Sequence, residues 1–276
     1  MKKLGIVVAL IVLIGAVWGF WRTKPNDAKI EKLVLTGSST IAPLAAEIGK
    51  RFESLHSNVR VDVQTGGSSR GVSDARAGLA DIGMASRALK DDEKDLLNFT
   101  IALDGISVIL NKANPIQSLN KQQIIDIYTG KIINWKEVGG NDAPITVVNK
   151  AEGRSTLELF LHYFGLKNTD VKPHVVIGDN QQGIKTVVGN PDAIGYVSVG
   201  TAEYGAGQGV AIKLLPLEGI AASVKNVRNR SFPLSRPLNL VTRTEPVGIV
   251  KDFIEFASST QINDLIEAQY FVPVAR

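Results

Sequence analysis

The chain has 276 residues, enough for one large domain or two modest lobes, since domains usually contain about 100–200 residues. A hydrophobic content of 44% with 21% charged residues is typical of a folded globular protein and excludes a disordered chain. The absence of cysteine excludes disulfides, thiolate metal sites, a cysteine nucleophile and lipid attachment through an N-terminal cysteine.

The formal net charge of +4 comes entirely from the N-terminus. Residues 1–29 contain five basic residues and one acidic residue, which leaves 26 basic and 26 acidic residues in 30–276. Nucleic-acid binding needs a dense basic face that displaces counterions from phosphates. No long Lys/Arg cluster is present in the sequence, so we expect no nucleic-acid partner.

The N-terminal segment predicts a membrane helix or an export signal. Residues 4–21 carry no charge and follow Lys2 and Lys3, and as a helix they would span about 27 Å. The preceding lysines favour a cytoplasmic N-terminus, so the rest of the chain would lie outside the inner membrane. A cleaved signal peptide is the alternative, but the bulky stretch 16–21 makes a poor cleavage site. The sequence therefore favours an uncleaved signal anchor and tether over 1–29.

After residue 29, short apolar runs alternate with amphipathic stretches, a pattern typical of an α/β protein. In chain order, the sequence predicts strands over 32–36, 59–64, 106–110, 145–149 and 193–199. It predicts helices over 41–55, 72–79, 124–130, 157–164, 247–257 and 261–267.

Three loops of similar design join a predicted strand to a predicted helix. They span 37–40, 66–71 and 150–156, and all are rich in glycine, serine or threonine. A helix N-terminus presents N–H groups without intrahelical acceptors and the positive end of the helix dipole, so it can hold an anion. Each loop alone is more often a helix cap. The threefold repetition favours a site for a small tetrahedral oxyanion.

Four basic residues in or beside these loops are candidate partners of such an anion: Arg70, Arg87, Lys150 and Arg154. A surface arginine more often interacts only with solvent, and Lys150 is the strongest candidate. A guanidinium can bind two oxyanion oxygens at once, whereas a lysine acts as a point charge. No loop has the Gly-Lys-Ser/Thr arrangement of a P-loop, so we do not expect NTP hydrolysis.

An enzyme is the first alternative function. Serine hydroxyls in the loops could act as nucleophiles, but a nucleophile needs an adjacent base. The histidines belong to no motif and form no metal constellation: His56, His162 and His174. We therefore expect neither catalysis nor a cofactor.

Six motifs in order resemble those of the periplasmic phosphate-binding proteins of phosphate ABC transporters, over about residues 32–276. They are TGSSTIAP at 36–43, GSSRGV at 67–72, ADIGMASR at 80–87, IYTGKI at 127–132 with Trp135, AEGRST at 151–156 and PDAIGYV at 191–197. The resemblance implies an α/β, two-lobed type II periplasmic-binding-protein fold with a hinge, preceded by an N-terminal transmembrane or signal helix.

The same resemblance implies how the chain is divided. Lobe 1 would comprise residues 30–110 plus 241–276, and lobe 2 would comprise residues 111–240. The two crossovers would lie near Asn111 and near 238–240.

The resemblance also implies the ligand-binding residues. Ser39 and Thr40 match the first-loop contacts, and Ser68 matches the second-loop serine with Ser69 beside it. Lys150 falls where the family usually has an arginine. The remaining candidates are Ser86, Arg87, Arg154, Ser155 and Thr156. Residues 154–156 fall where the family usually has Ser-Gly-Thr.

Ser86 is the departure that bears on selectivity, because some members have an aspartate there that accepts the proton of hydrogen phosphate. A hydroxyl carries no charge, so sulfate or another oxyanion stays an alternative ligand.

The expected function is capture of inorganic phosphate outside the cytoplasm for delivery to ABC transporter permease subunits. A membrane-tethered anion sensor or adaptor is the alternative.

Overall fold

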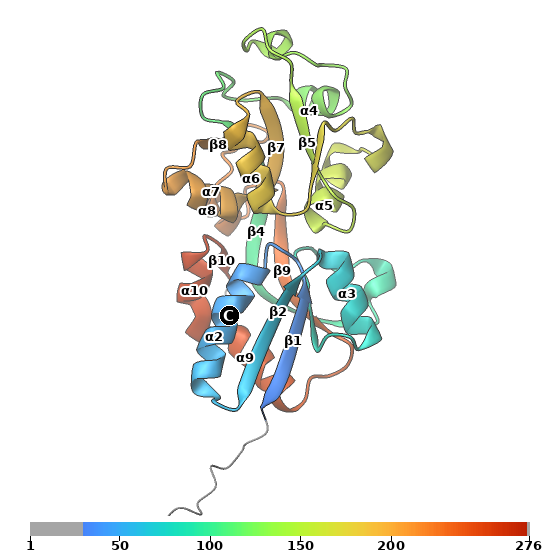
Figure 1. The fold of residues 1–276 in the computed structure, drawn as a ribbon, viewed down its shortest axis with the longest axis vertical. Helices are drawn as coiled ribbons and strands as arrows, with labels where there is room; N and C mark the ends of the chain where they lie inside the picture. The colour runs from blue at the N-terminus through green and yellow to red at the C-terminus, as the bar shows by residue number, and fades with distance from the viewer. Residues whose placement is uncertain (1–29, 275–276) are drawn as a thin grey trace, which may run out of the picture.

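The computed structural model describes residues 30–274, so the predicted signal anchor over 1–29 lies outside the described residues. Within 30–274, no helix is both long enough and apolar enough to cross a membrane. The described chain forms an α/β structure of two lobes joined by two strands, as Figure 1 shows. The two-lobed fold implied by the resemblance is thereby confirmed.

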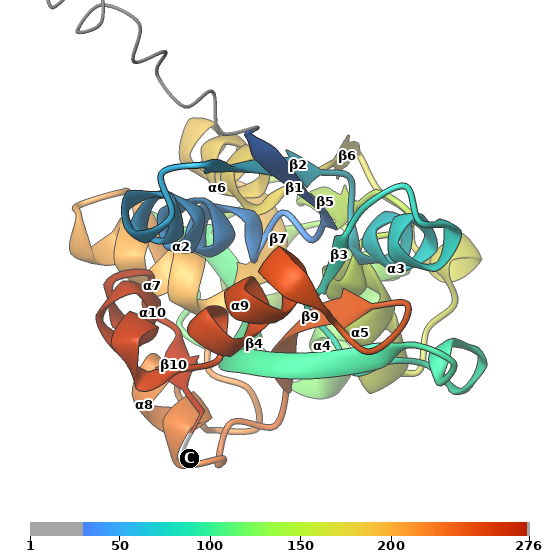
Figure 2. The ribbon, with the colours of Figure 1, turned by 90° about the horizontal axis from the view of Figure 1, so that it is seen from below.

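The first lobe is built on β1 (Glu31–Gly37), β2 (Val59–Thr65), β3 (Ile82–Ala85) and β9 (Ser235–Thr242). The strands β2, β1 and β3 are parallel neighbours, and β9 runs antiparallel to β3. The helices of this lobe are α2 (Ala42–Leu55), α3 (Ser68–Ala77), α9 (Gly248–Ala257) and α10 (Asn263–Ala268). In Figure 2, α2 and α9 lie on one face of this sheet and α3 lies on the other.

The second lobe contains β5 (Thr146–Lys150), β6 (Val175–Ile177), β7 (Ala193–Ser198) and β8 (Ile212–Leu214). Its helices are α4 (Lys121–Tyr128), α5 (Ser155–Phe164), α6 (Asn180–Gly189), α7 (Val199–Gly207) and α8 (Val224–Arg228). The strands β7, β5 and β6 are parallel neighbours, which brings the C-terminal end of β5 next to that of β6.

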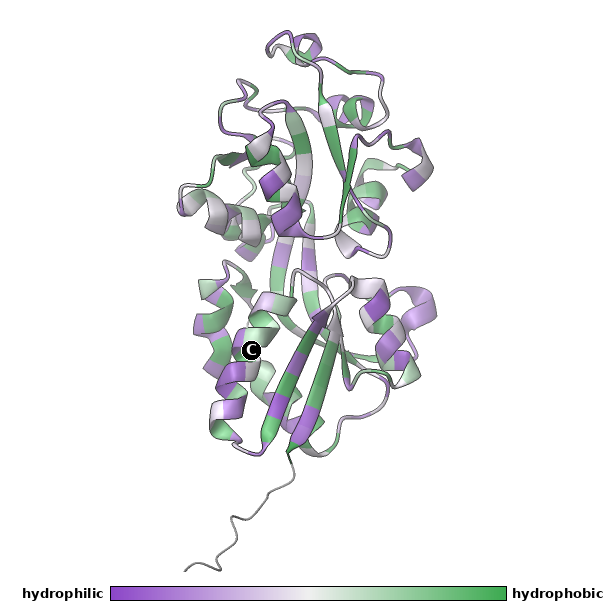
Figure 3. Ribbon diagram, viewed as in Figure 1, coloured by the Kyte–Doolittle hydropathy of each residue, from purple (hydrophilic) through white to green (hydrophobic). Residues whose placement is uncertain are grey.

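One long strand connects the two lobes. β4 (Leu97–Asn111) pairs antiparallel with β9 from Leu97 to Gly105 and with β7 from Ile106 to Leu110. The short strands β8 and β10 (Val272–Pro273) also pair with β4. β9 provides the return connection, and in Figure 3 both connecting strands change from hydrophobic to hydrophilic where they pass between the lobes.

The two hydrophobic cores indicate where the chain changes lobe. Ile101 and Leu238 pack in the core of the first lobe, whereas Ile106 and Leu234 pack in that of the second. These contacts support crossings near residues 105 and 235, before the positions near Asn111 and near 238–240 expected from the sequence. We therefore propose lobes of 30–105 plus 235–274 and 106–234. The first crossover was expected at the end of an apolar run, whereas β4 continues through the hinge and ends at Asn111 in the second lobe.

The predicted helices agree with the structure best where apolar residues recur every three or four positions. In α2, Leu44, Ile48 and Phe52 are buried along one face, and Pro43 occupies the first turn, where its missing N–H costs no hydrogen bond. No helix or strand is predicted from the sequence at β9, α6, α7 or α8. Three of these four elements are short or rich in glycine and polar residues, so their periodicity is weak.

Candidate functional site

Hydroxyl groups from three loops of the first lobe meet at the junction of the lobes. Ser38 follows β1, Ser68 begins α3, and Ser86 follows β3. Ser38 Oγ donates to Ser86 Oγ at 2.9 Å and accepts from the N–H of Thr40 at 3.2 Å. Ser68 Oγ accepts from the N–H of Ser86 at 3.1 Å. These side chains are buried, so they form a polar cluster screened from bulk water.

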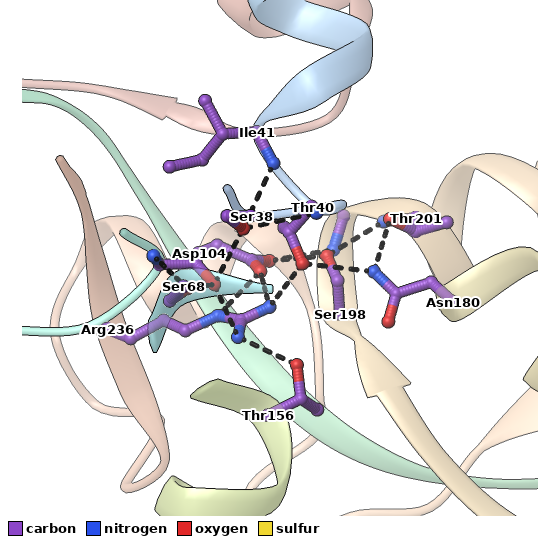
Figure 4. Close-up of polar contacts among 12 residues, drawn as sticks. Ser38, Thr40, Ile41, Ser68, Asp104, Thr156, Asn180, Ser198, Thr201 and Arg236 are labelled. Carbon is purple, nitrogen blue, oxygen red and sulfur yellow. Dashed lines mark hydrogen bonds and ion pairs between the residues drawn. The ribbon is translucent and has the colours of Figure 1, made fainter. Parts of the chain in front are cut away.

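Arg236, near the start of β9, lies at the centre of this polar cluster with 3% of its surface exposed. Figure 4 shows its guanidinium between groups of both lobes. Its Nη1 donates to Thr156 Oγ1 in the second lobe at 3.0 Å and to Ser86 Oγ at 3.3 Å, and its Nη2 donates to Thr40 Oγ1 at 3.2 Å. A single guanidinium therefore connects the N-terminal regions of α2 and α5 across the lobe junction.

Asp104, in β4, is the counter-ion of Arg236. Its Oδ2 accepts from Arg236 Nη2 at 2.7 Å and from Nε at 3.0 Å. Its Oδ1 accepts from Ser198 Oγ at 2.9 Å and from the N–H of Gly200 at 3.1 Å. With both carboxylate oxygens engaged, Asp104 neutralises and orients Arg236.

Lys150, at the end of β5, supplies a second buried cation, with 3% of its surface exposed. Its Nζ donates to Asn180 Oδ1 at 3.0 Å, and Asn180 Nδ2 donates to Thr40 Oγ1 in the first lobe at 3.2 Å. Burial and, after it, the positive charge of Arg236 lower the pKa of Lys150 to about 7. An anion placed beside this ammonium would offset both effects.

The N-terminus of α5 adds an unoccupied donor to the same region. Ser155 is the first residue of the helix and has 2% of its surface exposed, yet its Oγ has no hydrogen-bond partner among the described residues. The helix is capped by no side chain, and its first N–H groups lack intrahelical acceptors. A buried hydroxyl without a partner at a helix N-terminus is well suited to an anionic ligand.

Of the ten residues expected to bind the ligand, six lie together at this junction: Thr40, Ser68, Ser86, Lys150, Ser155 and Thr156. Ser39 lies at the edge of the junction, in a pocket of about 210 Å³ lined by residues of both lobes. The other lining residues of that pocket are Ala42, Pro43, Thr65, Asp179, Asn180, Gln181 and Thr201.

The other expected residues have different neighbours. Arg87 forms a buried ion pair with Glu93, with Nη1–Oε2 and Nη2–Oε1 distances of 2.6 and 2.8 Å. Ser69 Oγ donates to Glu158 Oε1 at 2.9 Å. The side chain of Arg154 lies close to Gly67 and Gly178, at the edge of the junction. Arg87 and Ser69 therefore interact with carboxylates, outside the cluster around Arg236.

The sequence interpretation missed Arg236, Asp104, Asn180 and Ser38. A charged residue among the apolar residues Phe232, Leu234, Leu238 and Leu240 was the available signal for Arg236, since a charge buried in a strand requires a partner or a ligand. Within 30–274, no group of three or more His, Asp or Glu side chains could hold a metal ion.

Comparison with known proteins gives one matching family model and several similar proteins. The model of the PBP superfamily domain matches residues 22–261. A solved phosphate ABC transporter substrate-binding protein with bound phosphate, from Clostridium perfringens, is 35% identical, with a TM-score of 0.81 over 89% of this chain and 100% of that one. An ABC-type phosphate transport receptor from Vibrio cholerae is 30% identical, with a TM-score of 0.71 over 88% and 100% of the two chains. The phosphate-binding protein PstS of Bacillus subtilis is 26% identical over 91% of this chain and 83% of its own length.

Proposed function

The chain belongs to the PBP superfamily, and on this premise we propose that it binds inorganic phosphate between its lobes for an ABC transporter. The relatives described above carry phosphate binding or phosphate transport in their names, and those names motivate the choice of ligand. In this proposal the protein is a solute-binding subunit, with no catalytic step, and it passes phosphate to permease subunits.

The observation that carries the proposal is the convergence of two buried cations with hydroxyls of both lobes. Arg236 and Lys150 lie within one hydrogen-bonded network that includes Thr40 of the first lobe and Thr156 of the second. Burying two cations together is costly unless an anion or a counter-ion accompanies them. Asp104 offsets only one of the two charges, so the network has a net positive charge for an anion when Lys150 is protonated.

Each group in this network would make a different kind of contact with the anion. Lys150 would supply the unbalanced charge, Arg236 would present paired N–H donors to two oxygens, and the α5 N-terminus would add backbone donors with Ser155 and Thr156. The hydrogen bonds that these groups now make to one another would be exchanged for bonds to the oxyanion. Closure of the lobes would then remove the anion from water and strengthen each contact.

Sulfate is the second candidate ligand, and Ser86 is the reason. Hydrogen phosphate carries a proton that needs an acceptor, whereas a fully ionised sulfate has none to donate. Ser86 brings no carboxylate, and both oxygens of Asp104 already accept hydrogen bonds. A hydroxyl can accept that proton without charge, so discrimination against sulfate would be weaker than with a free carboxylate.

Calorimetry on residues 30–276 stripped of bound anion tests the ligand. We expect phosphate to bind at micromolar concentration or below. Tight binding of sulfate or another oxyanion, with no binding of phosphate at micromolar concentration, would refute the phosphate assignment.

We further propose that residues 4–21 tether the protein to the outer face of the inner membrane. Their length without charge and the two lysines before them support this proposal. Mass spectrometry of the mature N-terminus distinguishes a tether from a cleaved signal peptide, because a start near residue 20 would mean that the segment is cleaved. Genes for a permease and an ATPase beside this one would favour transport, and a signalling neighbour would favour an anion sensor.

A further inference from the structure

Glu158, on the first turn of α5, extends from the second lobe to three groups of the first lobe. Its Oε1 accepts from Ser69 Oγ at 2.9 Å, and its Oε2 lies 2.8 Å from Arg87 Nε and 3.1 Å from Lys90 Nζ. The contact with Arg87 is an ion pair without good hydrogen-bond alignment, since neither atom has a hydrogen-bond partner among the described residues. One carboxylate thus meets two cations and a hydroxyl on the opposite lobe.

The groups of the first lobe that contact Glu158 are held in place by bonds within their own lobe. Arg87 is buried and makes two hydrogen bonds to Glu93, which also accepts from the N–H of Lys90 at 2.9 Å. Glu93 balances one of the two positive charges and leaves the other unbalanced. Glu158 supplies the missing negative charge only when the lobes are in contact.

We propose that Glu158 is a positioning residue that holds the lobes closed and thereby sets how slowly the ligand dissociates. The inference rests on the proposed function, in which the ligand lies between the lobes. Glu158 is two residues from Thr156 on the same helix, so the contact that holds Glu158 also holds the α5 N-terminus against Arg236. The affinity of a two-lobed binder depends on the fraction of molecules that can close, and an interlobe ion pair raises that fraction.

Electrostatic repulsion gives the opposite expectation for the same residue. A carboxylate on the first turn of α5 lies near the proposed anion site, and if its charge acted only on the anion, its removal would tighten binding. The ion pairs with Arg87 and Lys90 largely cancel that repulsion, and side-chain exposure of 3% for Arg87 and 24% for Glu158 limits screening by salt. The interlobe contact of Glu158 should therefore affect phosphate binding more than its repulsion of the anion does.

Replacement of Glu158 by glutamine tests the proposal, because glutamine keeps the shape and the acceptor for Ser69 but removes the charge. We expect phosphate to dissociate roughly tenfold faster from E158Q, with little change in the association rate, as stopped-flow measurements would show. Glu152→Gln is the matched control: it removes the same charge from the second lobe, at an exposed residue that accepts a hydrogen bond from Asn168 of the same lobe. Lys90→Ala should raise the dissociation rate too, and less than additively with E158Q.

Small-angle scattering of the phosphate-free proteins tests closure without reference to the ligand. We expect a larger radius of gyration for E158Q than for E152Q. Unchanged dissociation and equal radii, or tighter binding by E158Q, would overturn the role of Glu158. A wild-type protein that fails to bind phosphate would instead refute the proposed function, and the scattering comparison would still judge the interlobe contact.

Discussion

Arg236 and Asp104 form an ion pair at the lobe junction, with both side chains 1% exposed and Arg236 Nη2 2.7 Å from Asp104 Oδ2. The two residues come from β9 and β4, the strands that connect the lobes. Because the pair is neutral overall, the chain can keep a guanidinium buried when no anion is present. The donors of Arg236 that face away from Asp104 reach Ser86, Thr40 and Thr156. The ion pair between Arg236 and Asp104 therefore belongs both to the hinge strands and to the proposed binding site.

Replacing Arg236 by alanine should destabilise the protein and abolish tight phosphate binding. The change leaves Asp104 buried without its counter-ion, which typically costs about 3–5 kcal/mol of unfolding free energy. Urea unfolding and calorimetry measure the two effects. The double variant Arg236→Met with Asp104→Leu is the control. It should recover much of the stability, because neither member of the ion pair is left without its partner, but none of the affinity, because the guanidinium donors are absent. Wild-type affinity in that double variant would remove Arg236 from the site.

Lys150→Ala should weaken phosphate binding at least tenfold, which corresponds to about 1.4 kcal/mol. Lys150 is the buried cation of the network for which the described residues provide no ion-pair partner within 4 Å, so the anion itself would balance its charge. Lys150→Arg serves as the control, since it keeps a positive charge at the end of β5. Calorimetry on both variants checks the expectation, and an unchanged affinity for Lys150→Ala would contradict it.

The depressed pKa of Lys150 predicts opposite effects of pH on stability and on binding. Burial, followed by the charge of Arg236, lowers this pKa from 10.5 to about 7 in the folded protein. Between these values the unfolded chain holds one more proton than the folded one, so this group makes the unfolding free energy rise with pH from about 7 to 10.5. An anion favours the charged ammonium, so affinity should fall as the pH rises above 7.

Phosphate titrates as well, and the comparison with Lys150→Arg isolates the lysine. A guanidinium stays charged over this range, so Lys150→Arg should lose less affinity between pH 7 and 9 than the wild type does. Calorimetry in buffers of different ionisation enthalpy should detect proton uptake by the wild type on binding. Identical pH profiles for the two proteins would show that Lys150 does not titrate in the site.

The sequence predicted the parts of the site that depend on local chain geometry. Thr40, Ser68 and Thr156 lie in loops or at helix N-termini whose glycines and hydroxyls are visible as short motifs. A strand, a small polar loop and a helix start are all encoded within a dozen residues. A shared site for these three loops was suggested by their repeated design and by the family resemblance.

The remaining members of the site depend on contacts between residues distant in the chain. Arg236 and Asp104 are 132 positions apart and come together only through antiparallel pairing of β9 with β4. Arg87 shows the converse, because its motif suggested a ligand contact, whereas Glu93 and Glu158 engage its guanidinium. Sequence alone does not reveal which carboxylate a buried arginine will meet, since the choice depends on how the lobes pack.

Gly67→Ala should hold the lobes apart. Gly67 has a positive φ of 97°, and a Cβ placed there would lie 2.5 Å from the carbonyl oxygen of Gly153 in the opposite lobe. That oxygen accepts from the N–H of Ser69 at 3.3 Å, so the clash falls at the interlobe contact itself. Open lobes relieve it at the cost of ligand contacts, and we expect the affinity for phosphate to fall by roughly tenfold or more.

Gly78→Ala is the control that distinguishes the effect of this clash on affinity from the effect of backbone strain. Gly78 also has a positive φ, of 71°, but among residues 30–274 a Cβ there would have only Arg243 within 4 Å, at 3.9 Å. Both variants should lose about 1–3 kcal/mol of unfolding free energy through strain, and only Gly67→Ala should also lose affinity and show a larger radius of gyration. Equal affinities in the two variants would mean that the ligand binds without the contact between residues 67–69 and Gly153, and that closure of the lobes at this point is not required.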